Sequence, residues 1–276
     1  MPATLNIIGC GNVGKTLGRL WSRNDTYLVQ DVLNRSIESA QSAVAFIGSG
    51  RAVGEYADLR PADITMIAAS DDQILKCGEK LVHSGRLSPD TIVFHCSGAL
   101  RSSALQSAIH GAAVASVHPI RSFAAPEQIA NDFTGTYCGV EGDPRAVDIL
   151  TQGFSAIGAR MVPINGDFKI IYHSAAVFAC NYLVTLLDVA QQAYAKAGIP
   201  PEVALKLMEP LVRETVDNVF RLGPANALTG PIARGDLATA VKQYREVRNW
   251  NKWYARLYKQ MGKLTAGLAL RRRKSI

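Results

Sequence analysis

The fold is decided by the segment Ile7-Ile8-Gly9-Cys10-Gly11-Asn12-Val13-Gly14-Lys15-Thr16-Leu17-Gly18. It places a G-x-G-x-x-G fingerprint directly after the first short apolar run, Leu5 to Ile8. Gly9 permits the tight strand-to-helix turn, Gly11 leaves room for a pyrophosphate, and Gly14 lets the helix pack close to the sheet. The phosphates would lie on free N–H groups near Asn12 and Val13 at the helix start. The pattern predicts a dinucleotide site, and its alternative is an ordinary glycine-rich turn.

The residues after the second strand indicate which dinucleotide binds. That strand, Tyr27 to Leu33, is followed by Asn34-Arg35-Ser36. Asn34 stands where an NAD-specific domain would carry a carboxylate for the ribose hydroxyls. An arginine beside a small hydroxyl residue instead suits a 2′-phosphate. We therefore expect NADP(H), although Arg35 can also be read as a plain surface arginine.

Composition bounds the class of protein. The chain has 276 residues, of which 48% are apolar, so it can bury a substantial core as a globular protein. We find no secretory leader and no run of about 18 apolar residues free of charges or breakers, and therefore expect a cytoplasmic protein that does not enter a membrane. The five cysteines show neither disulfide-framework nor metal-ligand spacing, so no metal is expected.

The positive charge is concentrated at the C-terminal end. The formal net charge is +7, yet residues 242–276 hold eleven Lys or Arg against one Glu. The basic residues recur at helical spacing opposite an apolar stripe that runs from Trp250 to Leu268, which predicts a docked amphipathic helix with a solvated basic face. Because no nucleic-acid reader motif accompanies it, we expect no nucleic-acid partner.

The chain changes character near residue 165. Short apolar runs that alternate with helix-like segments predict a mostly parallel α/β sheet with helices on both faces. The candidate strands after the second are 64–69, 91–96, 113–118, 136–140 and 160–164, with a weak one at 51–54. Beyond them we expect long helices over 168–197, 201–221 and 236–269, ended by Gly and Pro or by the basic tail. The predicted domains are a Rossmann domain, 1–165, and an all-helical substrate and dimerisation domain, 166–276.

The first of these helices, 168–197, is apolar on all sides. Such a helix is buried, either at the centre of its domain or in a subunit interface. Because about 110 helical residues make a thin core, a homodimer built around this helix is the expected assembly.

Three polar residues on that helix are candidate catalytic groups. At 100° per residue, Lys169, His173 and Asn181 project at roughly 0°, 40° and 120°, so they can face one cleft. There they could hydrogen-bond a substrate carbonyl and deliver the proton that accompanies hydride transfer. Taken singly, they can also be a surface lysine, a core histidine and a packing amide.

Further candidates lie at the carboxyl ends of strands, where open α/β sheets bind ligands. Ala69-Ser70-Asp71 should pass along the cofactor. His95-Cys96-Ser97-Gly98 ends the next strand, and Ser97 and Gly98 are expected near the nicotinamide or the substrate, with His95 equally suited to the core.

Two loops carry groups for recognising an anion. His118-Pro119-Ile120-Arg121-Ser122-Phe123 follows a strand, and an arginine can clamp a carboxylate bidentately, so we expect His118, Arg121 and Ser122 at the substrate. In the segment Thr229-Gly230-Pro231-Ile232-Ala233-Arg234-Gly235-Asp236, Thr229 or Arg234 is a further substrate candidate. Each loop can instead be purely structural, because Pro119 and Gly230-Pro231 stiffen turns and Asp236 can cap a helix.

Together these motifs resemble those of one group of proteins. It is the group of bacterial Rossmann-like proteins with a helical C-terminal domain of formerly unknown function, in the 6-phosphogluconate dehydrogenase-like superfamily. The superfamily includes ketopantoate reductases, pyrroline-5-carboxylate reductases and β-hydroxyacid dehydrogenases. The resemblance implies NADPH-dependent reduction of a small carboxylate substrate in an interdomain cleft, usually by a dimer.

Carried onto this chain, Lys169 resembles the catalytic lysine that opens the interdomain helix of those relatives. They commonly place Asn four residues later, where this chain has His173, and its nearest Asn is Asn181. The resulting hypothesis is a reductase of ketopantoate or another 2-oxo acid in which Lys169 polarises the carbonyl, His173 and Asn181 orient the substrate and Arg121 binds its carboxylate. The alternatives are imine reduction, hydroxyacid oxidation and an NADP(H) sensor without turnover.

Overall fold

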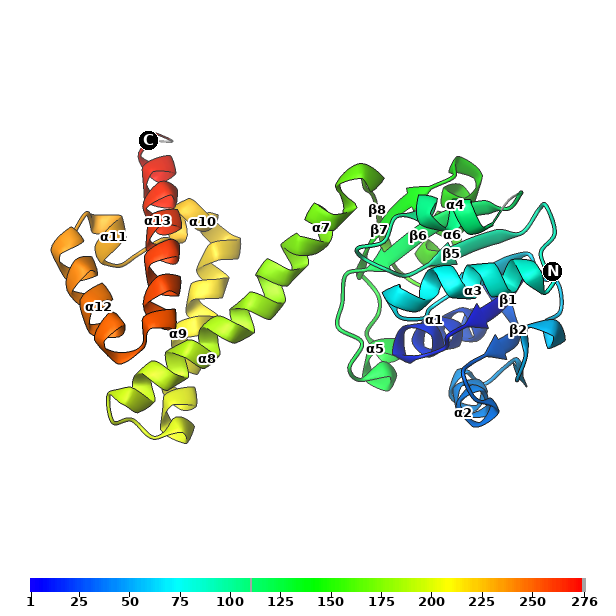
Figure 1. Cartoon of the computed structure of the whole chain (residues 1–276), viewed down its shortest axis with the longest axis horizontal. Helices are drawn as coiled ribbons and strands as arrows, with labels where there is room; N and C mark the ends of the chain where they lie inside the picture. The colour runs from blue at the N-terminus through cyan, green and yellow to red at the C-terminus, as the bar shows by residue number, and fades with distance from the viewer. Residues whose placement is uncertain (110, 275–276) are drawn as a thin grey trace. The chain divides into compact units, whose positions relative to one another are not determined.

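The computed structural model describes residues 1–109 and 111–274 and divides into two compact units, Met1–Ala179 and Cys180–Ile276 (Figure 1). The sequence placed the domain boundary at residue 165, where the strands end. The compact units divide one helix later, and Lys169, the first residue of helix α7 (Lys169–Ala176), is buried against the sheet of the first unit.

The described residues of the first unit form one eight-stranded sheet with the order β3-β2-β1-β4-β5-β6-β7-β8. Its first six positions follow the order of a dinucleotide-binding fold. Neighbouring strands are parallel except β6 and β7, so the predicted mostly parallel α/β architecture is confirmed. The strands are β1 (Ala3–Ile8), β2 (Tyr27–Leu33), β3 (Arg51–Val53), β4 (Ile64–Ile67), β5 (Ile92–His95), β6 (Ala113–Pro119), β7 (Tyr137–Gly142) and β8 (Arg160–Pro163).

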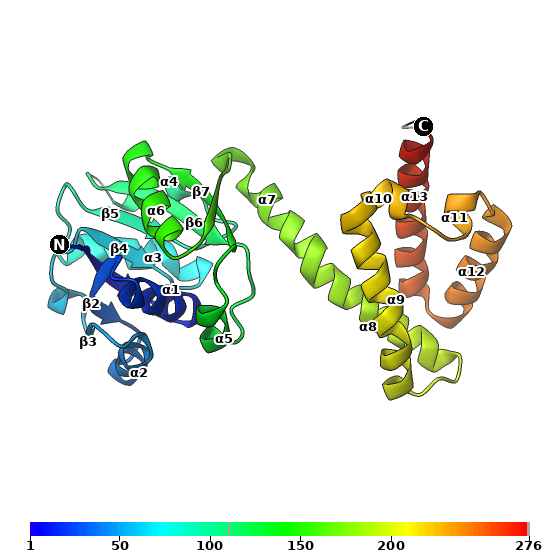
Figure 2. The same ribbon diagram turned by 180° about the vertical axis from the view of Figure 1, so that it is seen from behind.

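Helices cover both faces of this sheet (Figures 1 and 2). Successive strand residues point to opposite faces, so Ile7 and Ile8 enter different apolar clusters. One cluster buries α1 (Asn12–Arg23), α2 (Ile37–Ile47) and α6 (Pro144–Ala156), with Trp21 against Phe154. The other buries α3 (Asp71–His83) and α4 (Ser102–Ala108). The short α5 (Pro126–Asn131) precedes β7.

The predicted continuous helix over 168–197 is interrupted. A 3-10 turn, Gly166–Phe168, leads into α7, and a π-helical segment, Val177–Asn181, separates α7 from α8 (Tyr182–Lys196). A π turn holds more residues than an α turn, so the angular spacing that we assigned to Lys169, His173 and Asn181 does not apply across it.

The segment 168–197 is also not buried at the centre of its own domain, which was one of the two expectations for this helix. The other expectation, burial in a subunit interface, stays a prediction. Gly166–Lys196 is long and apolar enough to cross a membrane by length and composition, and none of its apolar window is buried. One such helix is weak evidence for a membrane span, because core helices of soluble proteins and signal sequences can have the same length and composition.

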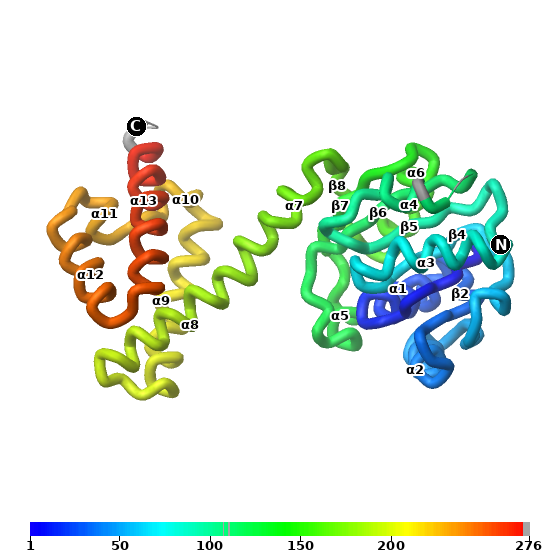
Figure 3. The backbone as a smooth tube through the Cα atoms, in the orientation of Figure 1, coloured from blue at the N-terminus to red at the C-terminus, as the bar shows by residue number. Residues whose placement is uncertain are grey.

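The second unit is all-helical, and Figure 3 traces its path. It contains α8, α9 (Pro201–Leu222), α10 (Pro224–Ala227), α11 (Pro231–Arg234), α12 (Leu237–Trp250) and α13 (Lys252–Lys274). The single helix predicted over 236–269 was wrong. The chain is extended at Asn251, whose side chain accepts hydrogen bonds from the N–H groups of Trp253 and Tyr254 and so starts a new helix.

Candidate functional site

The three fingerprint glycines meet three different demands. Gly9 has a φ of +74°, and a Cβ there would lie 2.8 Å from the Ala69 backbone. Gly14 lies on α1, where a Cβ would come within 3.1 Å of Ala68, so the helix is seated closely on the sheet. A Cβ on Gly11 would meet no protein atom within 4 Å among the described residues. The open space at Gly11 fits a ligand that approaches the backbone.

The start of α1 fits an anion. Gly11 is its N-cap residue and supplies no side-chain cap, and the first turn contains no acidic residue. The first N–H groups of a helix have no intrahelical partner, so they remain available to phosphate oxygens.

The three residues after β2 have different roles. Asn34 accepts a hydrogen bond from the backbone N–H of Cys10 at 2.5 Å and donates one to Ser39, so it fastens the glycine loop to α2. Ser36 is the N-cap of α2 and accepts from the N–H of Ser39. Arg35 is exposed and has no partner in the described part of the chain. A 2′-phosphate would therefore find a free guanidinium here.

A cavity of about 230 Å³ opens at the carboxyl ends of the central strands, inside the first unit. It brings together many of the residues predicted from the strand ends. Its lining consists of Val13, Ala68, Ala69, Asp71, Cys96, Ser97, Gly98, His118, Pro119, Arg121, Phe123 and His173. Ser70 is the exposed N-cap residue of α3 beside this lining.

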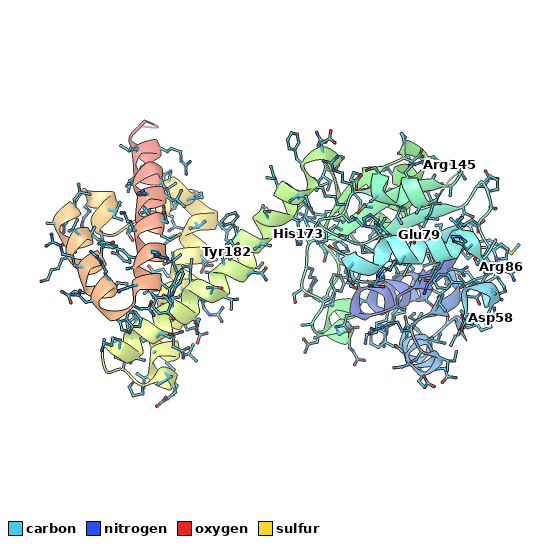
Figure 4. All side chains as sticks on the ribbon, viewed as in Figure 1. Asp58, Glu79, Arg86, Arg145, His173 and Tyr182 are labelled. Carbon is cyan, nitrogen blue, oxygen red and sulfur yellow. The ribbon has the colours of Figure 1, made fainter. Side chains whose placement is uncertain are left out.

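Two imidazoles face each other across Gly98. The rings of His118 and His173 have centroids 5.7 Å apart. A Cβ on Gly98 would lie 2.5 Å from His173 Nδ1 and 2.8 Å from His118 Nε2, so only glycine fits between them. His173, on α7, is labelled in Figure 4. Its Nδ1 is buried without a hydrogen-bond partner among the described residues. An unpaired buried nitrogen in a cavity wall is suited to a ligand atom.

The protonation of His118 follows from its partners. The Tyr172 hydroxyl lies 3.1 Å from His118 Nδ1 and accepts a hydrogen bond from the backbone of Gly139. Burial raises the pKa of Tyr172 to about 12, so its hydroxyl keeps its proton and can donate a hydrogen bond to Nδ1. Burial, with the charges of His173 and Lys169, lowers the pKa of His118 to about 4. The His118 ring is therefore neutral near pH 7, and a hydrogen bond from Tyr172 to Nδ1 would leave the imidazole proton on Nε2, the atom beside Gly98.

His95 is a buried structural residue, the second of the two readings given above. The N–H of Ser97 donates to His95 Nδ1 at 3.2 Å, so Nε2 carries the proton toward the Arg101 carbonyl oxygen at 3.3 Å. Burial, together with the charge of Lys169, lowers the pKa of His95 to about 4. The Ser97 hydroxyl accepts from the N–H groups of Ala99 and Leu100, which stabilises the turn after β5.

Lys169 is not among the residues that line the cavity. Its side chain is fully buried, and its Nζ donates to Ser116 Oγ and, at 2.9 Å, to Glu141 Oε1. Burial lowers the pKa of Lys169, although the Glu141 carboxylate opposes this effect. Burial alone would raise the pKa of Glu141, but hydrogen bonds from Ser102 and Lys169 outweigh it and hold the pKa below its ordinary value.

Arg121 reaches the cavity but is already paired. Its guanidinium binds the backbone oxygen of Asp132 and, at 2.6 Å, the Asp132 carboxylate. A substrate carboxylate would have to compete with Asp132. Ser122 is exposed beside it and does not line the cavity.

The remaining candidates lie in the second unit. Asn181 ends the π-helical segment and is exposed. Thr229 and Arg234 are also exposed: Thr229 lies just before the short helix α11, and Arg234 is its last residue. Asp236 caps α12 through the N–H of Thr239, as its structural reading predicted.

Two residues of the site were missed in the sequence. Glu141 directly follows the predicted strand 136–140, and Tyr172 lies beside His173 in an apolar segment. A carboxylate at a strand end was the only signal for Glu141, and nothing in the pattern distinguished Tyr172 from a core aromatic. Among the described residues, no cluster of three His, Cys, Asp or Glu could hold a metal ion.

A family model described as a domain of unknown function, DUF2520, matches residues 136–265. No curated protein matches the chain. The chain is similar to two bacterial proteins of known structure. Protein TM1727 from Thermotoga maritima is 26% identical with a TM-score of 0.76, covering 98% of this chain and 99% of that one. A Bacteroides fragilis protein, described as a candidate NADP oxidoreductase, is 21% identical with a TM-score of 0.75, covering 96% and 98%.

The Plasmodium falciparum pyrroline carboxylate reductase, whose structure has NADP bound, is similar at 13% identity with a TM-score of 0.60, covering 97% of this chain and 98% of that one. At such identities the likeness establishes the fold. The comparisons confirm the resemblance to Rossmann proteins with a helical C-terminal domain.

Proposed function

We propose that the chain is an NADP(H)-dependent oxidoreductase that reduces a small carboxylate-bearing carbonyl compound, such as ketopantoate or another 2-oxo acid. The paired imidazoles of His118 and His173, held across Gly98 in a cavity at the strand ends, are the observation that carries the proposal. The similar proteins described with NADP support the cofactor and the oxidoreductase class. The open space at Gly11, the uncapped start of α1 and the free Arg35 fit the pyrophosphate and the 2′-phosphate.

When bound, NADPH supplies a hydride to the substrate carbon. In this proposal the Nε2–H of His118 donates a hydrogen bond to the carbonyl oxygen and stabilises the negative charge that hydride addition places on it, and the resulting alkoxide takes its proton from solvent water. A neutral imidazole suits this role because it keeps its N–H proton while it donates a hydrogen bond to the developing oxyanion. In this proposal the Tyr172 hydroxyl donates to Nδ1, 3.1 Å away, which keeps the imidazole proton on Nε2.

His173 completes the polar part of the cavity. Its unpaired Nδ1 is available to orient the substrate, as the sequence predicted for this residue. Arg121 remains the proposed carboxylate ligand within the first unit, after exchange of its Asp132 partner. Asn181, Thr229 and Arg234 remain proposed substrate contacts from the helical domain. Lys169 takes a different role, argued in the next section.

The decisive experiment follows NADPH absorbance with a panel of 2-oxo acids, cyclic imines and, in the reverse direction, 3-hydroxy acids. Turnover of a 2-oxo acid supports the proposal, and turnover of only imines or hydroxyacids assigns the alternative chemistry. His118→Gln should lower kcat by about 10²-fold, the usual contribution of one hydrogen-bond donor to a developing oxyanion, with an unchanged Kd for NADPH. His83→Gln, at an exposed histidine on α3, is the matched control. NADPH binding without turnover on any substrate would identify a sensor.

We expect the active assembly to be a cytoplasmic homodimer that binds neither nucleic acid nor membrane. The apolar side chains exposed along α7 and α8 support a protein interface, because exposed apolar surface of this kind is usually covered by a partner.

A further inference from the structure

Lys169 is anchored by the sheet of the first unit. Ser116 on β6 and Glu141 on β7 are directly paired across these antiparallel strands. The Lys169 Nζ donates to both side chains. Glu141 is fixed in turn by Ser102, which donates its backbone N–H at 2.8 Å and its hydroxyl at 2.6 Å. Two strands and the start of α4 therefore converge on one ammonium group.

This anchor is the main buried contact of α7. Lys169 is the only residue of that helix classed as buried in the described structure, whereas Ile170 and Ile171 are 62% and 67% exposed. Without the ammonium contact, the first turn of α7 would have little buried surface to hold it against the sheet.

The cavity groups lie one helical turn further along α7. Tyr172 and His173 stand three and four positions after Lys169, and such residues lie on the same face of a helix. Tyr172 bonds His118, and the ring of His173 lies against that of His118. A rotation or lift of the first turn would therefore move both groups relative to His118.

We infer that Lys169 is a positioning residue: its buried contact with Glu141 and Ser116 sets Tyr172 and His173 against His118. The inference rests on the proposed function for its consequence in turnover, but the arrangement itself is measurable without turnover. It replaces the direct proton transfer expected from the sequence, because the Nζ donates to Ser116 and Glu141 and Lys169 does not line the cavity.

The test uses Lys169→Met and Glu141→Gln, with Lys76→Met on the exposed face of α3 as the matched control. We expect both site variants to shift the imidazole ¹⁵N resonances of His118 and His173 in the protein without substrate. Hydrogen exchange of the α7 amides should become about tenfold faster or more, since a locally held segment opens more often when its anchor is lost. The Kd for NADPH should be unchanged, which shows that each variant is folded.

The results of these measurements distinguish the positioning role of Lys169 from the proposed catalytic function. Imidazole resonances and α7 exchange that stay at wild-type values in either site variant would overturn the inference. If Lys169→Met does not fold, Glu141→Gln decides alone, because it weakens the contact while keeping the lysine. Where a substrate is found, both variants should lower kcat by about tenfold or more with KM for NADPH unchanged. If no substrate is found, the proposed function fails while the resonance and exchange results still judge the anchor.

Discussion

At the scale of single residues, the fingerprint glycines illustrate how one motif combines folding and binding. Gly9 and Gly14 are required by the protein itself, through a positive φ and through close contact of α1 with the sheet. Gly11 meets no such demand among the described residues. Its function can therefore be tested without disturbing the fold.

We expect Gly11→Ala to weaken NADPH binding about tenfold or more, equivalent to about 1.4 kcal/mol, because the added methyl group occupies space meant for the pyrophosphate. The thermal midpoint of the free protein should stay within about a degree of wild type. Isothermal titration and thermal denaturation measure the two quantities. Gly54→Ala is the control, since a Cβ there also meets nothing within 4 Å but lies away from the motif. Wild-type affinity for NADPH in Gly11→Ala would contradict the placement of the cofactor.

We expect Arg35 to determine whether the site prefers NADPH or NADH. Arg35→Ala should raise the Kd of NADPH by about 10-fold to 100-fold, because a charge-assisted hydrogen bond contributes about 1.5–3 kcal/mol. The Kd of NADH should not change, since NADH lacks the 2′-phosphate. Arg86→Ala, at the exposed arginine labelled in Figure 4, controls for general loss of positive charge. Equal losses for both cofactors would refute the assignment.

The sequence indicated which strand-end residues lie close together, but not where every side chain points. The sequence named His118, His173, Ser97 and Gly98, and the structure gathers all four around one cavity. It could not show that Lys169 turns to a carboxylate 28 positions earlier in the chain. Nor could it show that Asp132 already occupies Arg121. Such pairings depend on the tertiary fold, which spacing along one helix or loop does not reveal.

At the scale of elements, strands were easier to predict than helix interruptions. Strands buried on both faces appear as continuous apolar runs, and each predicted run lies on a strand of the sheet. The π segment Val177–Asn181 and the break at Asn251 carry neither Gly nor Pro. The side chain of Asn251 caps the helix that follows it. The spacing of apolar residues, from which the helix was predicted, does not reveal such a cap.

Two histidines at the ends of β5 and β6 should make the stability of the first unit depend on pH. His95 and His118 have folded-state pKa values lowered from 6.5 to about 4. Between these values the unfolded chain binds more protons than the native one, so the free energy of unfolding falls as the pH falls. Urea midpoints should therefore decrease from about pH 6.5 to about pH 5, before most carboxylates titrate.

His95→Gln should reduce this pH dependence, and His83→Gln should leave it intact. If His95→Gln does not fold, an NMR titration of wild type decides, because the His95 ring should stay neutral down to about pH 4. A urea midpoint independent of pH between 6.5 and 5, or a His95 ring that titrates near 6.5, would contradict the burial argument.

At the scale of the whole molecule, the two units differ in how many apolar side chains they bury. The first unit has two apolar clusters, one on each face of its sheet. In the described part of the second unit the buried apolar residues are only Ala204, Met208 and Ala255. Large apolar side chains there stay exposed, among them Val184 at 69%, Trp253 at 74% and Leu264 at 69%. The apolar stripe predicted to dock α13 is therefore only partly covered within one chain.

Because a helical unit with so small a core leaves much apolar surface uncovered, we expect a second copy of the chain to cover it. Light scattering at micromolar concentration in detergent-free buffer should give twice the chain mass of 29.7 kDa. Val184→Arg should shift the mass toward the monomer and lower the thermal midpoint, because a buried unpaired charge is costly at an interface. Leu28→Arg, on β2 and 52% exposed, is the matched control and should remain dimeric. A monomeric wild type would refute the dimer, and a wild type that stays in solution only with detergent would assign the apolar helix to a membrane instead.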